Sequence, residues 1–267
     1  MLGQLFHTVL YQPMFNLLVW FYNIIPGHDV GLAIIIITIV IKLVLHPLSV
    51  KSIKSQKALQ DLQPKMDELK KKYKDNPQEM TKATMNLYKE QKISPFSSCL
   101  PILIQLPFLI AVYQVFRQGL TNTQSLDILY PFVANPGSLN PIAFGFLDLS
   151  KPQWILAVLA GAAQYWVSKM LMSKKQPNVK SAKDEGMTAM MNKQMMYFMP
   201  LITVFIGISL PGGLTLYWFV TTLLTGIQQL YIFKKQNGKE VSQEVKIDDQ
   251  TSVIKNNNTN VIKKEDK

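Results

Sequence analysis

The stretch VGLAIIIITIVIKLVLHPLSV at residues 30–50 decides the fold class of this chain. A helix crosses the hydrocarbon core of a bilayer in about 20 mostly apolar residues, and this stretch satisfies that requirement. Four further apolar segments follow it, at residues 96–116, 153–172, 194–210 and 213–233. The sequence therefore predicts an all-α polytopic membrane protein with five transmembrane helices.

The N-terminal segment, residues 1–29, is less apolar than these five spans. Between Leu2 and Ile25 it is interrupted by Gln4, His7, Gln12, Pro13, Asn16 and Asn23. Its Trp and Tyr side chains suit the depth of the membrane interface. We expect an amphipathic helix lying in the outer interface, with a sixth span as the alternative.

Lysines are concentrated in every second segment between the predicted spans, and this pattern predicts the orientation of the chain in the membrane. Residues 51–92 contain eleven lysines, residues 169–193 six and residues 234–267 eight, so these segments hold 25 of the 28 basic residues. Loops that remain in the cytoplasm carry such an excess. The five-span prediction therefore places the N-terminus outside and the C-terminus in the cytoplasm.

The cytoplasmic segments differ in pattern. Within residues 51–92, apolar residues recur at helical spacing on both sides of the turn Lys74–Pro77, which predicts a helical hairpin. The hairpin could be a solvated element near anionic lipid or a docking element for incoming chains. The tail, residues 234–267, is polar and is expected to be disordered.

Lys42 lies twelve residues into the first predicted span, where an ionisable side chain is costly and suggests function. Thr38 lies one turn earlier on the same helix face. A second interpretation is that Lys42 extends its side chain to the inner headgroups. Polar side chains in the other spans, including Gln105, Gln164 and Thr222, favour a hydrated cavity shared between helices.

Several functional classes lack the residues they need. The five predicted spans contain no Asp or Glu, and the sequence has no phosphate-binding or hydrolase motif. Cys99 is the only cysteine and the three histidines lie far apart, which argues against a metal site. We therefore predict a protein that is not an enzyme, has no cofactor or metal, and does not bind nucleic acid directly.

Two segments carry a family resemblance. SPFSSCLPILIQLPFLIAVYQVF at residues 94–116 resembles the second core span of the YidC/Oxa/Alb insertases, and PGGLTLYWFVTTLLTGIQQ at residues 211–229 resembles their last span. The first span with its hairpin, and LAGAAQYWVSKMLM at residues 159–172, are similar to further parts of that family. Within the family the chain resembles the short bacterial form.

The resemblance implies a membrane insertase and chaperone of the bacterial inner membrane. Such a protein moves short hydrophilic tails across the bilayer and releases apolar helices into it through a positively charged groove. It makes Lys42 the charge of the groove, and it implies that the other groove residues are Thr38, Gln105, Gln164, Tyr217, Trp218 and Thr222. The family usually has Arg at the position of Lys42 and Asn at that of Thr222.

The implied partners are nascent membrane proteins and the lipid bilayer. Association with the general secretion translocon and the ribosome stays open at this point. Two other classes of function also stay open: a scaffold subunit of a secretion complex that inserts nothing, and a small-solute channel or transporter.

Overall fold

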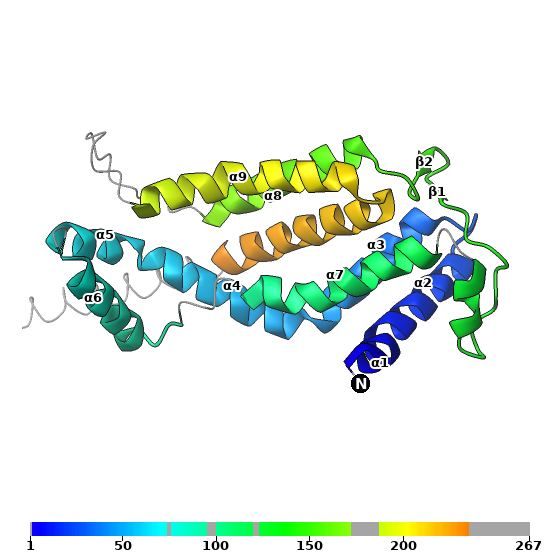
Figure 1. Cartoon of the computed structure of the whole chain (residues 1–267), viewed down its shortest axis with the longest axis horizontal. Coiled ribbons are helices and arrows are strands. Elements are labelled where there is room, and N and C mark those ends of the chain that lie inside the picture. The colour runs from blue at the N-terminus through cyan, green and yellow to red at the C-terminus, as the bar shows by residue number, and fades with distance from the viewer. Residues whose placement is uncertain (1, 74–75, 95–99, 120–122, 172–186, 235–267) are drawn as a thin grey trace, which may run out of the picture.

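The structure is a computed structural model, and it describes residues 2–73, 76–94, 100–119, 123–171 and 187–234 (Figure 1). Helices dominate the described residues, which confirms the expected helical class. The predicted tail lies outside the described residues from residue 235 onward, as does the start of the second predicted span at residues 96–99. The sequence did not predict the two short strands β1 (Ile142–Ala143) and β2 (Leu147–Asp148), which pair antiparallel.

The N-terminal segment forms one continuous helical stretch. It consists of α1 (Leu2–Phe6), a π-helical turn (His7–Tyr11) and α2 (Gln12–Ile24). One face of α2 is buried against α3 and α7, with Phe15 and Val19 fully buried. The stretch is thus part of the hydrophobic core, and its expected position in the membrane interface remains a prediction.

The first predicted span is bent. Helix α3 (Val30–Val44) begins at the N-cap Asp29, whose Oδ1 accepts the backbone N–H of Leu32 at 3.0 Å. Helix α4 (His46–Asp61) then continues at an angle of 71° to α3. Pro47 lies at this bend and accounts for it, because proline lacks a backbone N–H and its ring clashes with the preceding turn.

The segment predicted as a cytoplasmic hairpin contains three helices, counting the helix that begins before it. Helix α4 is followed by α5 (Gln63–Lys72) and α6 (Pro77–Glu90), and α5 packs against α6. The side chain of Asn76 caps α6 by accepting the backbone N–H of Glu79 at 3.2 Å. Proline at the first position of α6 suits a helix start, as its missing N–H needs no partner there.

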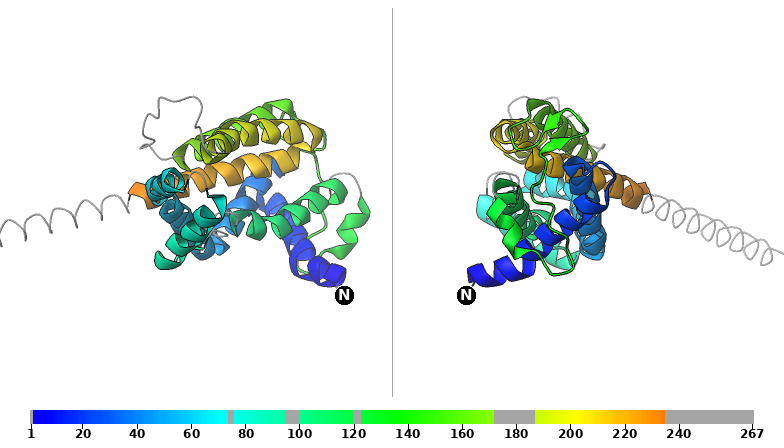
Figure 2. Two further views of the ribbon diagram at one scale, coloured as in Figure 1. Left: turned by 60° about the vertical axis from the view of Figure 1, so that its left-hand side comes forward. Right: turned by 90° about the vertical axis from the view of Figure 1, so that its right-hand side faces the viewer.

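Four long helices complete the molecule. They are α7 (Leu100–Gly119), α8 (Trp154–Leu171), α9 (Met187–Ser209) and a C-terminal helix at residues 212–234. In Figures 1 and 2, α8 and α9 lie side by side, α2, α3 and α7 form the other side, and the C-terminal helix runs between them.

Small residues let α8 and α9 approach closely. A Cβ added to Gly207 would lie 2.9 Å from the Cβ of Ala157, closer than real Cβ contacts allow. A Cβ on Gly161 would overlap Val204 and lie 3.2 Å from the Pro200 carbonyl oxygen. Small residues at a helix interface are typical of packing inside membranes, where close backbone approach replaces the hydrophobic effect.

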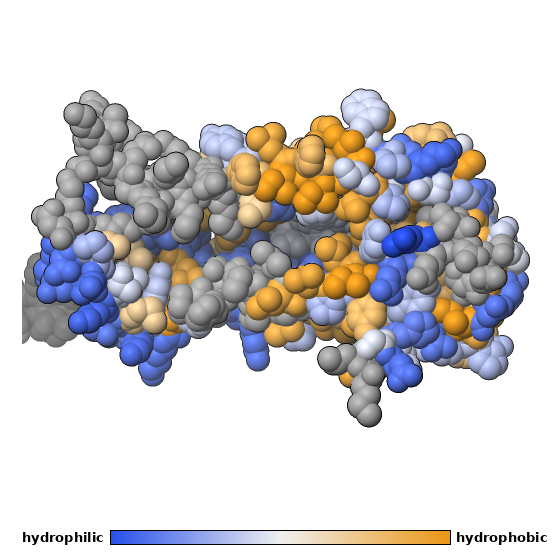
Figure 3. Space-filling model, in the orientation of Figure 1, coloured by the Kyte–Doolittle hydropathy of each residue, from blue (hydrophilic) through white to orange (hydrophobic). Residues whose placement is uncertain are grey.

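Large apolar side chains cover the outside of this helix pair. Among the most exposed are Phe205 at 77%, Leu201 at 66% and Trp154 at 65%. The space-filling view shows apolar surface over α8 and α9 (Figure 3). Soluble monomers rarely expose continuous apolar patches of this kind.

By length and composition, fewer of the described helices qualify as membrane spans than the sequence predicts. Within the described residues, α8 alone is long and apolar enough to cross a membrane, and the bent pair α3–α4 qualifies as a second if it is counted as one span. Residues 196–209 of α9 form a shorter apolar helix. The five-span topology therefore remains a prediction.

Candidate functional site

Lys42 and Thr225 connect the first long helix to the C-terminal helix. Lys42 Nζ donates a hydrogen bond to Thr225 Oγ1 at 2.7 Å, and that hydroxyl donates to the carbonyl oxygen of Thr221 at 2.7 Å. The Lys42 side chain is half-buried, so its amine lies between the two helices. Nothing in the local sequence pattern identifies Thr225 as the partner of Lys42.

No acidic side chain neutralises Lys42 in the described part of the chain. Ion pairs in that part of the chain include Lys57 with Asp61 and Lys151 with Asp148, and neither involves Lys42. Helices α3 and α7 and the C-terminal helix contain no Asp or Glu, and Asp61 at the end of α4 is paired with Lys57. A charge in a partly dry environment without a counter-ion attracts anionic groups strongly, because the local dielectric constant is low.

Buried polar side chains continue from Lys42 toward α4. Ser52 and Gln229 are each 2% exposed, and Gln229 Nε2 lies 3.5 Å from Gln56 Oε1. The oxygen atoms of Ser52, Thr221, Gln228 and Gln229 are buried without a hydrogen-bond partner among the described residues. Buried polar atoms need partners, so this region is chemically suited to water or to a polar guest.

Gln105 and Tyr217 form a second polar contact. Gln105 lies on α7 and donates a hydrogen bond from its side-chain amide to the hydroxyl of Tyr217 on the C-terminal helix. Tyr217 lies eight residues before Thr225, which is about 12 Å at the rise of an α-helix. The tyrosine is 1% exposed.

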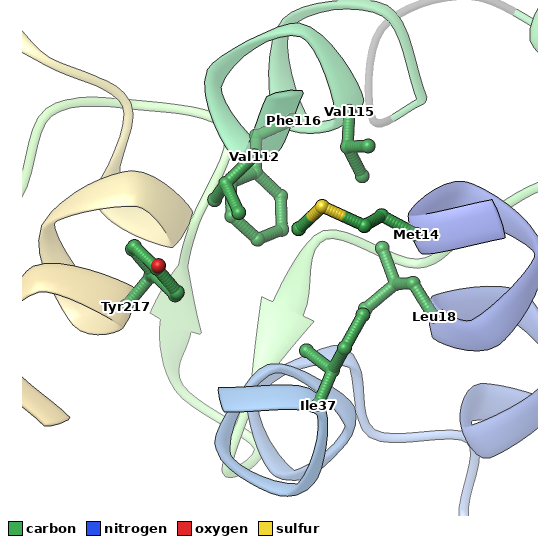
Figure 4. Close-up of a pocket in the computed structure, with 7 residues that line it drawn as sticks. All are labelled: Met14, Leu18, Ile37, Val112, Val115, Phe116 and Tyr217. Carbon is green, nitrogen blue, oxygen red and sulfur yellow. The ribbon is translucent and has the colours of Figure 1, made fainter. Parts of the chain in front are cut away.

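The ring of Tyr217 also lines a small apolar pocket. The close-up shows the pocket between α2, α3, α7 and the C-terminal helix, with its side chains pointing toward one another (Figure 4). Its lining consists of Met14, Leu18, Ile37, Val112, Val115, Phe116 and Tyr217. Tyr217 therefore has two kinds of neighbour: its hydroxyl accepts from Gln105, and its ring lines the apolar pocket.

Beyond the pocket, the loop before α8 covers the ends of α2 and α3. Asn16 is 2% exposed on α2, donates to the carbonyl oxygen of Ile128 at 3.2 Å and accepts the backbone N–H of Tyr130 at 2.5 Å. Gln12 Nε2 donates to the same carbonyl at 3.0 Å. The polar residues that make the N-terminal segment a poor span thus hold this loop in place.

The remaining predicted site residues, all in the described part of the chain, make no hydrogen bond to Lys42. Thr38 is fully buried, but its hydroxyl donates to Ile34 of its own helix at 2.6 Å and not toward Lys42. Thr222 is buried, with 7% of its surface exposed. Gln164 on α8 and Trp218 on the C-terminal helix are half-buried. The structure thus pairs Gln105 with Tyr217, and it gives no hydrogen bond between Lys42 and the other predicted residues it describes.

The space-filling view shows a hollow over the C-terminal helix, between the α8–α9 pair and α7 (Figure 3). Within the described residues, no group of three or more His, Cys, Asp or Glu side chains could hold a metal ion. The described site offers the amine of Lys42, several amide and hydroxyl groups, and the side chains of the apolar pocket. Such a set can hold a polar or acidic segment without covalent chemistry.

Comparison with known proteins identifies close similarities. The sequence model described as "60Kd inner membrane protein" matches residues 20–240. The chain is 35% identical over 205 residues to the membrane protein insertase YidC of Fusobacterium nucleatum, covering 77% of this chain and 86% of the relative. It is 37% identical over 216 residues to the insertase of the same name from Clostridium tetani, covering 80% of this chain and 86% of the relative.

Longer relatives match as well. The membrane protein insertase YidC of Geobacter metallireducens is 33% identical over 229 residues, covering 85% of this chain and 37% of the relative. The matched region therefore corresponds to nearly all of some relatives and to a part of others.

Proposed function

This chain belongs to the 60 kDa inner membrane protein family of YidC-type membrane protein insertases, and we propose that it holds the hydrophilic tail of a client protein at Lys42 while the client's apolar segment enters the bilayer. The main support is that Lys42 has no acidic partner in the described residues and bonds instead to the neutral Thr225. A client carboxylate would supply the missing counter-charge.

The polar side chains around Lys42 support a hydrated groove. Moving a polar tail through about 30 Å of hydrocarbon is costly, because backbone and side-chain polar groups lose their hydrogen bonds. Ser52, Thr221 and Gln229 present buried oxygen atoms that a hydrated tail could satisfy. We propose Gln105, Gln164, Tyr217, Trp218 and Thr222 as further groove residues, and Thr38 as a structural residue of its wall.

The apolar pocket argues for a groove that ends within the membrane. Ile37 lies five residues from Lys42, or about 7.5 Å along the helix, and it faces Phe116 and Met14 across the pocket. An apolar layer of this kind opposes passage of ions and small solutes. A channel or transporter, which needs a continuous polar path, is therefore not favoured.

Release of the client requires apolar surface beside the groove. Exposed apolar side chains on α8 include Ile155 at 48% and Val158 at 47%, and Ile227 on the C-terminal helix is 51% exposed. We propose that the client's apolar segment leaves along these helices. Partition would drive this step, because each buried CH₂ contributes about 0.8 kcal/mol.

The topology and partners belong to the same proposal. We propose five spans in the bacterial inner membrane, with residues 51–92 in the cytoplasm and the N-terminus outside. Nascent membrane proteins are the proposed substrates. The lysines of the α4–α6 segment would place it near anionic headgroups and incoming chains. The translocon and the ribosome are further candidate partners.

Reconstitution in liposomes tests this mechanism. The substrate is a single-span protein with an acidic N-terminal tail, and protection of the tail from external protease measures insertion. We expect protection with the wild-type chain and Lys42→Arg, and protection close to that of empty liposomes with Lys42→Ala. A substrate with a neutral tail is the matched control and should respond less to Lys42→Ala.

Two results would contradict the proposal in different ways. Equal protection by all three proteins would show that the Lys42 charge is not needed. Protection by the wild-type chain no greater than that of empty liposomes would favour a scaffold that requires another protein for insertion.

A further inference from the structure

The β1–β2 hairpin exposes aromatic side chains beside the start of α8. Phe146 is 80% exposed, the highest value among the exposed large apolar side chains described, and Ile142 is 45% exposed. Their neighbours in the strands, Ala143 and Leu147, are buried in the core. The hairpin therefore has one face in the protein and one apolar face that no described residue covers.

Hydrogen bonds fix the hairpin to three helix ends. Asp29 at the start of α3 accepts the backbone N–H of Phe144 through Oδ2 at 2.5 Å. Gln153, just before α8, donates to the carbonyl oxygen of Asp148 at 2.6 Å. Lys151 accepts the backbone N–H of Gly212, at the start of the C-terminal helix, at 2.9 Å.

The turn between β1 and β2 contains two residues with positive φ. Phe144 has φ of +55° and is followed by Gly145 at +80°. The left-handed conformation is unfavourable for a residue with a Cβ. The aromatic ring of Phe144 packs close to Gly31, where a Cβ would lie 3.0 Å from it. The backbone conformation and the packing against Gly31 therefore hold the turn and its aromatic side chains in defined positions.

The exposed face of the hairpin continues the apolar face of α8. Trp154 is the first residue of α8 and is 65% exposed, and Val158 follows on the same helix face at 47%. Lys151 lies between hairpin and helix with its side chain 76% exposed. Aromatic rings with a nearby lysine are typical of the boundary between headgroups and acyl chains.

We propose that the hairpin and Trp154 form an interfacial anchor, with Phe146 and Ile142 inserted among the lipids of the outer leaflet. The occupant of this surface is the lipid bilayer itself, because the surface is continuous with the exposed apolar face of α8. The exposed Lys151, which is ion-paired with Asp148, lies at its polar edge. Immersing Phe146 removes from water a side chain whose full burial is favourable. The anchor would fix the depth of α3, α8 and the C-terminal helix, whose ends are tied to the hairpin.

This inference rests on the proposed membrane topology but not on insertion activity. Cys99 is the only cysteine, so a Cys99→Ser background allows single-site spin labelling. Labels are placed at Phe146→Cys, Ile142→Cys and, as the matched control, Ser138→Cys, an exposed polar position of the same loop. The measurement compares collision of each label with oxygen and with a water-soluble nickel complex, in liposomes of zwitterionic and anionic lipid.

We expect the labels at Phe146 and Ile142 to collide mainly with oxygen, and the label at Ser138 mainly with the nickel complex. Equal nickel accessibility at all three sites would overturn the proposal. Labels at Phe146 and Ile142 that are shielded from both reagents would also overturn it, because protein rather than lipid would then cover the surface. Insertion assayed on the same vesicles reports separately on the proposed function.

Discussion

Lys42 Nζ and Thr225 Oγ1 lie 2.7 Å apart, although 183 residues separate them in the chain. The threonine is neutral, so the bond orients the lysine without neutralising its charge. In the proposed function, the restrained lysine would remain available for an acidic client. This combination suits a groove that must bind a segment briefly and then release it.

Removal of the Thr225 hydroxyl should weaken insertion less than removal of the Lys42 charge. Thr225→Val keeps the shape of the side chain, but Lys42 loses its hydrogen-bond acceptor, a loss of about 1.5–3 kcal/mol when a charged group is involved. We expect tail protection to fall below that of the wild-type chain and to stay above that of Lys42→Ala. Thr225→Ser should restore it.

The control for this prediction is Thr203→Val. Thr203 is buried, and its hydroxyl donates to Met199 of its own helix. A loss of insertion as large in Thr203→Val as in Thr225→Val would indicate a general effect of threonine removal.

A polar residue in the apolar pocket should make the membrane leaky. Ile37 is 4% exposed and lines the pocket next to Tyr217. Ile37→Ser would let water enter between the polar region and the loop before α8. We expect faster dissipation of a pH gradient across proteoliposomes than with the wild-type chain.

Ile39→Ser serves as the comparison, because Ile39 lies on the same helix but is 39% exposed. Equal leak rates for the two variants would argue against the pocket as a permeability barrier.

Adding one methyl group at Gly207 should destabilise the pairing of α8 and α9. The nearest atoms, Cβ and Cα of Ala157 at 2.9 and 3.2 Å, cannot rotate away. Overpacking of this kind costs about 1–3 kcal/mol. We expect Gly207→Ala to lower the thermal unfolding midpoint in detergent, whereas Gly3→Ala, which meets nothing within 4 Å, should not lower it. A midpoint unchanged in Gly207→Ala would mean that the helices separate at little cost.

The loop before α8 should contribute a pH-dependent stability. The side-chain hydrogen bond from Ser150, followed by that from Lys151, lowers the pKa of Asp148 below its ordinary value. The folded pKa is thus below the unfolded one. The ionised carboxylate stabilises the fold above the unfolded pKa, and this stability is lost as pH falls through the folded pKa.

Thermal unfolding of the wild-type chain and Asp148→Asn measures this effect. The wild-type chain should be the more stable near neutral pH, and the difference should shrink below about pH 4. A difference that does not change with pH would assign the role of Asp148 to its shape alone.

Several features of the fold could be predicted from the sequence because they depend on local pattern. Apolar runs indicated the long helices, and Pro77 indicated the start of α6. The lysine in the first apolar run was visible as an exception among its neighbours. The bend of 71° after α3 was missed, because Pro47 is tolerated within some membrane helices and marks a break in others. The β1–β2 hairpin was missed because two-residue strands leave no period to detect.

The sequence by itself determined that this chain is helical, that it has apolar segments of membrane length and that one of them contains a lysine. Only the tertiary structure decided which residues share a site: Thr225 with Lys42, Tyr217 with Gln105, and Thr38 with its own helix instead of the groove. The physical reason is that hydropathy depends on residue type along the chain. Side-chain partners depend instead on the rotation and spacing of packed helices, which contacts such as Gly207 with Ala157 set from distant parts of the sequence.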